Sequence, residues 1–274
     1  MPFDLPQALI QATVQLEQPA GEGKRIVGTG FLISAPTPDG RPRTVLVTAT
    51  HVFEMMPGAD AKIGYRVANA DGSWDYAPEP LKIRDADGKP LWTGHPARDV
   101  AAMAVKAPDM FVKAAIPRRW LAQDDTFAQQ QVTTGDEMMA LGFPRGLSAN
   151  TAGFAILRAG RVASFPVGPA KIYPTFLLDF AVFPGNSGGP VFVSTPVRRH
   201  AERPDSPATQ FIAGILSKQV ELNNEHLGIG VVTHAAFIGE TIALLDAPEM
   251  PAPTEVVAAK AGKAVAAGET SKSD

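Results

Sequence analysis

The sequence predicts an all-β protein, and three observations lead to this fold class. Short runs rich in β-branched and other apolar residues recur along the chain, separated by turn-forming clusters such as PTPDGRP and RDADGKP. Only residues 234–246 combine sufficient length with the apolar spacing of an amphipathic helix. No internal repeat of solenoid length is present. Many short strands at this spacing predict a β-sandwich or a barrel.

The predicted strands follow one another at short intervals up to the predicted helix. They are 12–17, 25–33, 43–49, 62–68, 99–105, 137–143, 154–163, 175–182, 190–194, 210–217 and 228–233. An apolar stripe runs along the predicted helix, made of Ala236, Ile238, Ile242 and Leu245. Residues 196–208 have the composition of an exposed loop. The Ala-, Pro- and Lys-rich tail 247–274 is expected to be disordered because it has little to bury.

The composition of the 274-residue chain narrows the classes of partner. A net charge of −3 without a long basic block argues against nucleic acid. No run of about 18 apolar residues occurs, which argues against a membrane span. The absence of cysteine excludes disulfides and thiolate metal sites, and no H-E-x-x-H motif occurs, so we expect no metal or other cofactor. The N-terminal stretch lacks secretory-signal features, which predicts a cytoplasmic protein, or a periplasmic or secreted one if a leader has been removed.

The stretch FPGNSGGPVF, residues 183–192, interrupts two apolar runs with three glycines around Ser187. Such a segment is either a plain glycine-rich turn or a place where the glycines clear space for a substrate backbone to approach a serine. A serine hydroxyl is a poor nucleophile unless a neighbouring base takes its proton. The second interpretation therefore needs a histidine and a carboxylate elsewhere in the chain.

His51 and Asp99 are the best candidates for these two groups. His51 follows a strong strand in VLVTATHVF, and Asp99 opens a strand in RDVAAMAV. A carboxylate there could fix the tautomer of the imidazole and stabilise the imidazolium. Each residue alone is a weak signal, but the chain order His, Asp, Ser is that of chymotrypsin-type enzymes.

Several motifs together resemble the trypsin/chymotrypsin-like serine peptidases, and within them the bacterial HtrA-type branch. They are GTGFLIS (28–34), VTATHVF (47–53), RDVAAMAV (98–105), MALGFPRG (139–146), AGRVAS (159–164), LDFAVFPGNSGGPVF (178–192), AGILS (213–217) and GIGVV (228–232). The resemblance implies one protease domain over 1–246, built from two six-stranded antiparallel β-barrels with the active site between them. Barrel one would span about 8–110, barrel two about 130–233, and a C-terminal helix 234–246.

The resemblance also implies a role for each site residue. Ser187 would attack the scissile carbonyl, His51 would act as base and then as acid, and Asp99 would orient His51. The backbone N–H groups of Gly185 and Ser187 would form the oxyanion hole. Gly188 and Gly189 would permit tight packing behind the nucleophile.

The sequence departs from the digestive members at Asn186, where they carry Asp. A neutral side chain cannot pair with a freshly cut N-terminal amine, so we expect no activation by N-terminal cleavage. HtrA-type members carry Asn here but add PDZ domains, and the segment 247–274 is too short for one.

The substrate pocket is predicted from the same resemblance. Ala181, six residues before Ser187, would form an apolar pocket base, which favours small or medium apolar P1 side chains. Its walls would come from Ser217, Lys218, Gln219 and Gly228. Lys218 leaves an acidic preference open.

The predicted partner is a polypeptide substrate, with a regulatory protein partner also open. Two rival functions remain on the sequence alone: an inactive peptidase fold used as a binding module, and a latent protease switched on by a partner. An esterase has little support, because the chain order His51, Asp99, Ser187 is that of chymotrypsin-type enzymes rather than that of the α/β-hydrolases.

Overall fold

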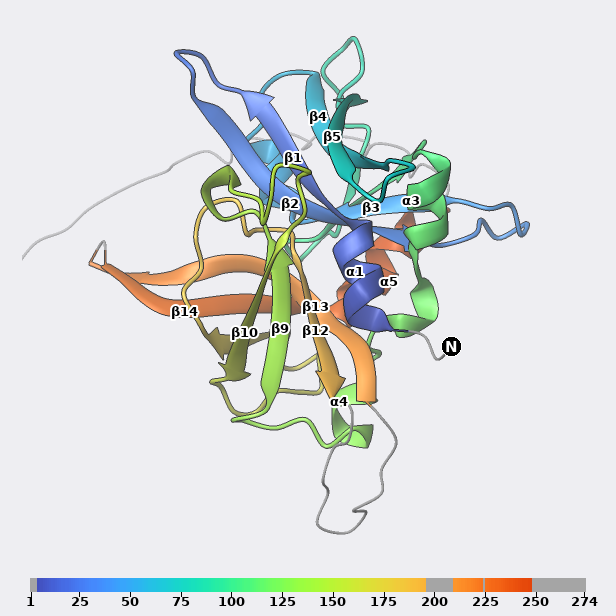
Figure 1. The fold of residues 1–274 in the computed structure, drawn as a ribbon. Helices are drawn as coiled ribbons and strands as arrows, with labels where there is room; N and C mark the ends of the chain where they lie inside the picture. The colour runs from blue at the N-terminus through green and yellow to red at the C-terminus, as the bar shows by residue number, and fades with distance from the viewer. Residues whose placement is uncertain (1–3, 196–208, 224, 248–274) are drawn as a thin grey trace, which may run out of the picture.

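The computed structural model describes residues 4–195, 209–223 and 225–247. The predicted exposed loop and nearly all of the predicted tail lie outside the described residues. Figure 1 shows two β units, with the sheet of β1–β5 above and the strands β9–β14 below. Helices α1, α3 and α5 gather at one side of the junction between the units. The all-β class and the C-terminal helix are confirmed.

The first unit is an eight-stranded sheet with the strand order β5-β4-β1-β2-β3-β7-β6 and with β8 paired to β2. Its strands are β1 (Thr13–Pro19), β2 (Arg25–Ser34), β3 (Thr44–Thr48), β4 (Asp60–Ala68), β5 (Trp74–Lys82), β6 (Thr93–Gly94), β7 (Ala101–Val105) and β8 (Ile116–Pro117). We expected six strands and a closed barrel here, whereas the hydrogen-bonded path ends at β5 and β6. The edge strand β5 was not predicted because it contains Pro78 and Pro80. Proline is tolerated only at edges, since it cannot donate to a ladder.

The second unit is the predicted six-stranded barrel, and it closes in the order β10-β11-β14-β13-β12-β9. Its strands are β9 (Glu137–Gly142), β10 (Ile156–Val162), β11 (Thr175–Asp179), β12 (Pro190–Thr195), β13 (Thr209–Leu222) and β14 (Glu225–His234). The apolar core runs through both units without a break. The long β13–β14 hairpin extends away from the barrel (Figure 1).

Short helices join and cover the strands. They are α1 (Leu5–Ala12), α2 (Thr50–Glu54), α3 (Asp109–Ala114), α4 (Thr126–Gln129) and α5 (Ala235–Leu244), with 3₁₀ turns at Arg118–Trp120 and Pro144–Gly146. Helix α1 was not predicted because it is only two turns long. Asp4 caps it by accepting from the Gln7 N–H, and it buries Leu5, Leu9 and Ala12. Within the described residues, no helix has the length and apolar character needed to cross a membrane.

Candidate active site

His51 and Asp99 meet because two antiparallel strands bring them to the same end of the first sheet. The ladder between β3 and β7 pairs Thr48 with Ala101, so residues just beyond this pair face each other. Asp99 Oδ1 accepts from the backbone N–H of His51 at 3.1 Å. Asp99 Oδ2 lies 2.7 Å from His51 Nδ1. One carboxylate therefore holds both the backbone and the ring of His51.

This contact assigns the tautomer of His51. An ionised carboxylate can only accept, so Nδ1 carries the proton and Nε2 is left as the basic atom. The side chains of His51 and Asp99 are 31% and 32% exposed. In the described part of the chain, His51 Nε2 has no hydrogen-bond partner. The partly exposed imidazole can thus accept a proton at Nε2 from a neighbouring group.

Two consecutive tight turns present Ser187. In the first, Asn186 N–H donates to Phe183 O at 3.0 Å, with Pro184 and Gly185 at the central positions. Gly185 has a φ of 95°, and proline followed by a residue with positive φ defines a type II turn. In the second, Gly189 N–H donates to Asn186 O at 3.1 Å, and Gly188 has a φ of 88°.

The glycines of these turns are required by close packing as well as by φ. A Cβ on Gly185 would clash with Phe143 O, and one on Gly188 would clash with Thr29 O. A Cβ on Gly189 would clash with Leu141 O. The turn that carries Ser187 therefore packs closely against backbone atoms of both β units. The predicted tight packing behind Ser187 is what the structure contains.

Gly185 and Ser187 present backbone N–H groups that have no partner among the described residues. The Pro184 carbonyl accepts from the Arg145 N–H at 2.6 Å. Because the C=O and N–H of a trans peptide point in opposite directions, this bond turns the Gly185 N–H away from Arg145. Two free donors around one serine can stabilise a developing negative charge.

The Ser187 hydroxyl donates to the Ser217 carbonyl at 3.0 Å rather than to His51. A register shift between Leu216 and Lys218 marks a bulge at Ser217. Bulges commonly redirect groups beside active sites. The Ser217 hydroxyl lies 2.7 Å from Thr233 Oγ1, inside the barrel. The partner of the serine hydroxyl was not foreseen, because a rotamer leaves no trace in a sequence.

The Ser187 turn nonetheless lies against the strand that leads into His51. A Cβ on Gly188 would also clash with the Thr48 hydroxyl and would approach the Ala49 N–H to 3.1 Å. Ala49 is the N-cap of α2, the helix whose second residue is His51. The structure thus packs the turn that carries Ser187 against the segment that leads into His51, whose ring Asp99 contacts.

The predicted pocket residues occupy different environments. Ala181 and Gly228 are half-buried, and Lys218 is exposed. Gln219 donates to Glu221 Oε1 at 2.7 Å. The apolar side chains nearest Gly230 come instead from Val182 and Leu216, since a Cβ on Gly230 would lie 2.8 and 3.1 Å from them. Val182 is only 5% exposed.

Three residues near the site were missed by sequence reasoning. Arg145 has a φ of 52°, unusual for a residue other than glycine, and its backbone N–H donates to the Pro184 carbonyl in the turn that precedes Ser187. The guanidinium carbons of Arg145 and Arg158 lie 5.6 and 5.4 Å from the ring centroid of Phe183. Thr29, in the GTGFLIS motif, contacts the Ser187 turn directly. Thr29 and Arg145 each lie in a quoted motif, GTGFLIS and MALGFPRG, whereas Arg158 lies in none.

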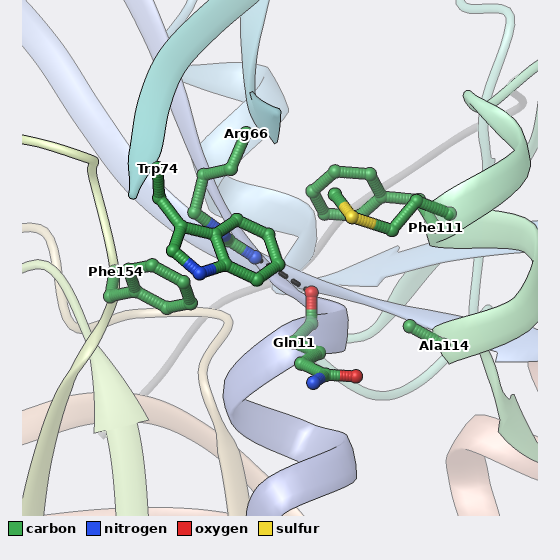
Figure 2. A pocket seen from close by; sticks show the side chains of 7 residues that line it. Gln11, Arg66, Trp74, Phe111, Ala114 and Phe154 are labelled. Carbon is green, nitrogen blue, oxygen red and sulfur yellow. Dashed lines mark hydrogen bonds between the residues drawn. The ribbon is translucent and has the colours of Figure 1, made fainter. Parts of the chain in front are cut away.

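A separate small pocket lies between α1, α3, β4 and β5 (Figure 2). It is lined by Gln11, Arg66, Trp74, Met110, Phe111, Ala114 and Phe154 and encloses about 200 Å³, part of which is open to solvent. Arg66 donates to Gln11 O at 2.6 Å, drawn as the dashed line in Figure 2, and to Gly153 O at 3.1 Å. Within the described ranges, no group of three His, Cys, Asp or Glu side chains could hold a metal ion.

A family model described as a trypsin-like peptidase domain matches residues 28–195. The chain belongs to this family. The match to the trypsin-like peptidases contains His51, Asp99 and Ser187. A search of curated protein sequences finds no match.

Solved structures of other trypsin-like peptidases have a similar fold. The HtrA-type protease AlgW, solved with a tripeptide, aligns with a TM-score of 0.52 and 17% identity, over 88% of this chain and 62% of its own. This chain therefore spans less than two thirds of AlgW. The active form of the Rv3671c protease from M. tuberculosis aligns with a TM-score of 0.50 and 19% identity, over 90% of this chain and 86% of its own. At these identities the likeness shows the fold alone.

Proposed function

We propose that this chain is a serine endopeptidase with Ser187 as nucleophile, His51 as general base and acid, and Asp99 as the residue that orients His51. The observation that carries the proposal is the double contact of Asp99 with His51, at 3.1 Å to its backbone and 2.7 Å to its ring. With the Nδ1 proton held by Asp99, His51 Nε2 can accept the proton of Ser187, whose turn packs against the segment leading into His51. The family membership of the chain supports the same reaction.

In the first half-reaction, the Ser187 hydroxyl leaves the Ser217 carbonyl by rotation about χ1 and turns to His51. As Oγ attacks the scissile carbonyl carbon, its proton passes to Nε2 and the carbonyl electrons move to oxygen. The N–H groups of Gly185 and Ser187 donate to that oxyanion. When the C–N bond breaks, His51 returns the proton to the leaving amine, and an ester to Ser187 remains.

In the second half-reaction, water attacks the ester while His51 takes one of its protons. The oxyanion forms again in the same position. Its collapse releases the carboxylic acid product, and His51 returns the proton to Ser187. Asp99 accepts from His51 Nδ1 and stabilises the imidazolium that forms in each half-reaction.

The substrate of this reaction is a polypeptide, an inference supported by the tripeptide in the AlgW structure. We propose small or medium apolar residues at P1. Ala181 is apolar and half-buried, and the proposed wall residues include no carboxylate to pair with Lys or Arg. The exposed Lys218 is the one cation among the proposed wall residues.

A peptide library tests this function and the pocket separately. We expect the purified protein to cleave after Val, Ala, Leu or Met, and Ser187→Ala to cleave nothing. A preference for Arg or Lys would overturn the proposed pocket while leaving the activity intact. If the wild-type protein cleaves no member of the library, the proposed activity fails for the isolated chain.

A latent protease is the second candidate, and the hydrogen bond from Ser187 to Ser217 favours it over an inactive module. In that state the hydroxyl must be released before it can reach His51. Cleavage that appears only after adding extract from the source cells, and only with Ser187 present, would support this candidate. Equal activity with and without extract would remove it.

A further inference from the structure

Thr29 lies on β2 between the two β units, flanked by two glycines. A Cβ on Gly28 would clash with Val52, which follows His51, and a Cβ on Gly30 would lie 2.7 Å from Leu46 Cδ1. Alternate residues of a strand face opposite sides. The glycines therefore let β2 pack closely within the first unit, while the Thr29 side chain projects towards the barrel.

Every polar group of Thr29 takes part in a hydrogen bond, and the residue is 0% exposed. Its backbone N–H donates to Ser187 O at 2.9 Å. Its hydroxyl donates to Gly185 O at 2.6 Å and accepts from the Phe143 N–H at 3.1 Å. Its carbonyl accepts from the Thr48 hydroxyl at 2.7 Å. One side chain from the first unit thus bonds two separate loops of the second.

Hydrogen bonds from Arg145 and Thr29 hold the two peptide planes that meet at the Gly185 Cα. The Arg145 N–H holds the Pro184 carbonyl, which orients the peptide that contains the Gly185 N–H. The Thr29 hydroxyl holds the Gly185 carbonyl, which orients the next peptide. The same hydroxyl holds Phe143, two residues before Arg145, so it also steadies the loop that makes the first bond.

We infer that Thr29 is a positioning residue for the oxyanion hole. This inference rests on the proposed function. The Thr29 hydroxyl is buried behind the turn and does not touch substrate, so its effect passes through the orientation of the Gly185 N–H. The Gly185 N–H interacts most strongly with substrate when charge develops on the carbonyl oxygen. Misaligning it should therefore raise the free energy of the transition state more than that of the bound substrate.

Thr29→Val tests the inference, because it keeps the shape of the side chain and removes only the hydroxyl. We expect kcat to fall by about tenfold to a hundredfold, with KM within about twofold of wild type. Thr29→Ser restores the hydroxyl and should recover most of kcat. Thr241→Val is the matched control: it deletes another fully buried hydroxyl, which donates to Phe237 O on α5. It should leave kcat unchanged.

A second measurement, by NMR, reports on the environment of the Gly185 N–H in the absence of substrate. In ¹⁵N-labelled protein, the amide cross-peak of Gly185 should shift or broaden in Thr29→Val and stay near the wild-type position in Thr29→Ser and Thr241→Val. An unmoved Gly185 cross-peak in a folded Thr29→Val protein overturns the inference, as does an unchanged kcat. If wild type cleaves no peptide, the proposed function fails, while the cross-peak still decides whether Thr29 positions Gly185.

Discussion

The surroundings of Ser187 and the pocket lined by Arg66 both join segments that are far apart in the sequence, but only in the pocket are the polar groups paired within the protein. Arg66 is 1% exposed and donates to three backbone carbonyls, with its guanidinium carbon 5.1 Å from the Phe111 centroid and 4.7 Å from the Phe154 centroid. Around Ser187, the N–H groups of Gly185 and Ser187 have no partner in the described part of the chain.

Under the proposed function, this difference separates a pocket that stabilises the fold from a site that carries out a reaction. In the Arg66 pocket, hydrogen bonds and ring stacking already satisfy the buried cation, which leaves little for a ligand to gain (Figure 2). Around Ser187, the N–H groups of Gly185 and Ser187 have no partner among the described residues, which is what the proposed stabilisation of a charge that appears only during reaction requires. Substitutions in the two regions should therefore separate activity from stability.

Asp99→Asn should have the largest effect. An amide in place of the carboxylate can donate to Nδ1 and favour the wrong tautomer of His51, so we expect kcat to fall by about 10⁴-fold. The melting temperature should change little, because the side chain is partly exposed and keeps its shape. Peptide hydrolysis and thermal unfolding of the same preparation check both statements. A loss of less than about tenfold would contradict the role of Asp99.

Arg66→Met should have the opposite profile. Methionine keeps much of the apolar stem but leaves the carbonyls of Gln11 and Gly153 without their donor, so the free energy of unfolding should fall by roughly 2–3 kcal/mol. Urea denaturation measures this change. Burial lowers the pKa of Arg66 to about 10, so the side chain is still charged near neutral pH. A fall in kcat per folded molecule, without a fall in stability, would show that the pocket serves the reaction.

His234→Phe should have the smallest effect, limited to acid stability. Burial lowers the pKa of His234 to about 4, below its usual 6.5, and its ring lies against Phe127 and Phe176 at 4.7 and 5.0 Å. Between these pKa values only the unfolded chain binds the proton, so wild-type stability should fall as the pH drops. The loss from about pH 7 to about pH 5 should be about 2 kcal/mol. Phenylalanine keeps the ring packing and should remove this part of the dependence. Equal pH dependence in both proteins would contradict the assignment.

Much of the fold could be predicted because its signals are local. All eleven predicted strands are present, since each is a short apolar run bounded by turn residues. Strand β5 was missed because Pro78 and Pro80 mask a strand that survives only at an edge. The first barrel does not close, because closure depends on contacts between distant strands rather than on any one strand's sequence.

The candidate site also has features that local sequence predicts and features that depend on distant contacts. The glycines around Ser187 could be predicted because positive φ and close approach both demand glycine. The role of Thr29 could not be predicted, because it depends on loops more than 100 residues further along the chain meeting one hydroxyl. The roles of His51, Asp99 and Ser187 stay predictions until chemistry tests them.

Intact-mass analysis with a fluorophosphonate tests the central claim most directly, because this reagent labels only an activated serine. Wild-type protein should gain the mass of one adduct, and Ser187→Ala should gain none. An unlabelled wild-type protein, with and without cell extract, under conditions that fully label a reference serine protease would contradict the account. An adduct that persists in Ser187→Ala would contradict it equally, because the reactive serine would then lie elsewhere.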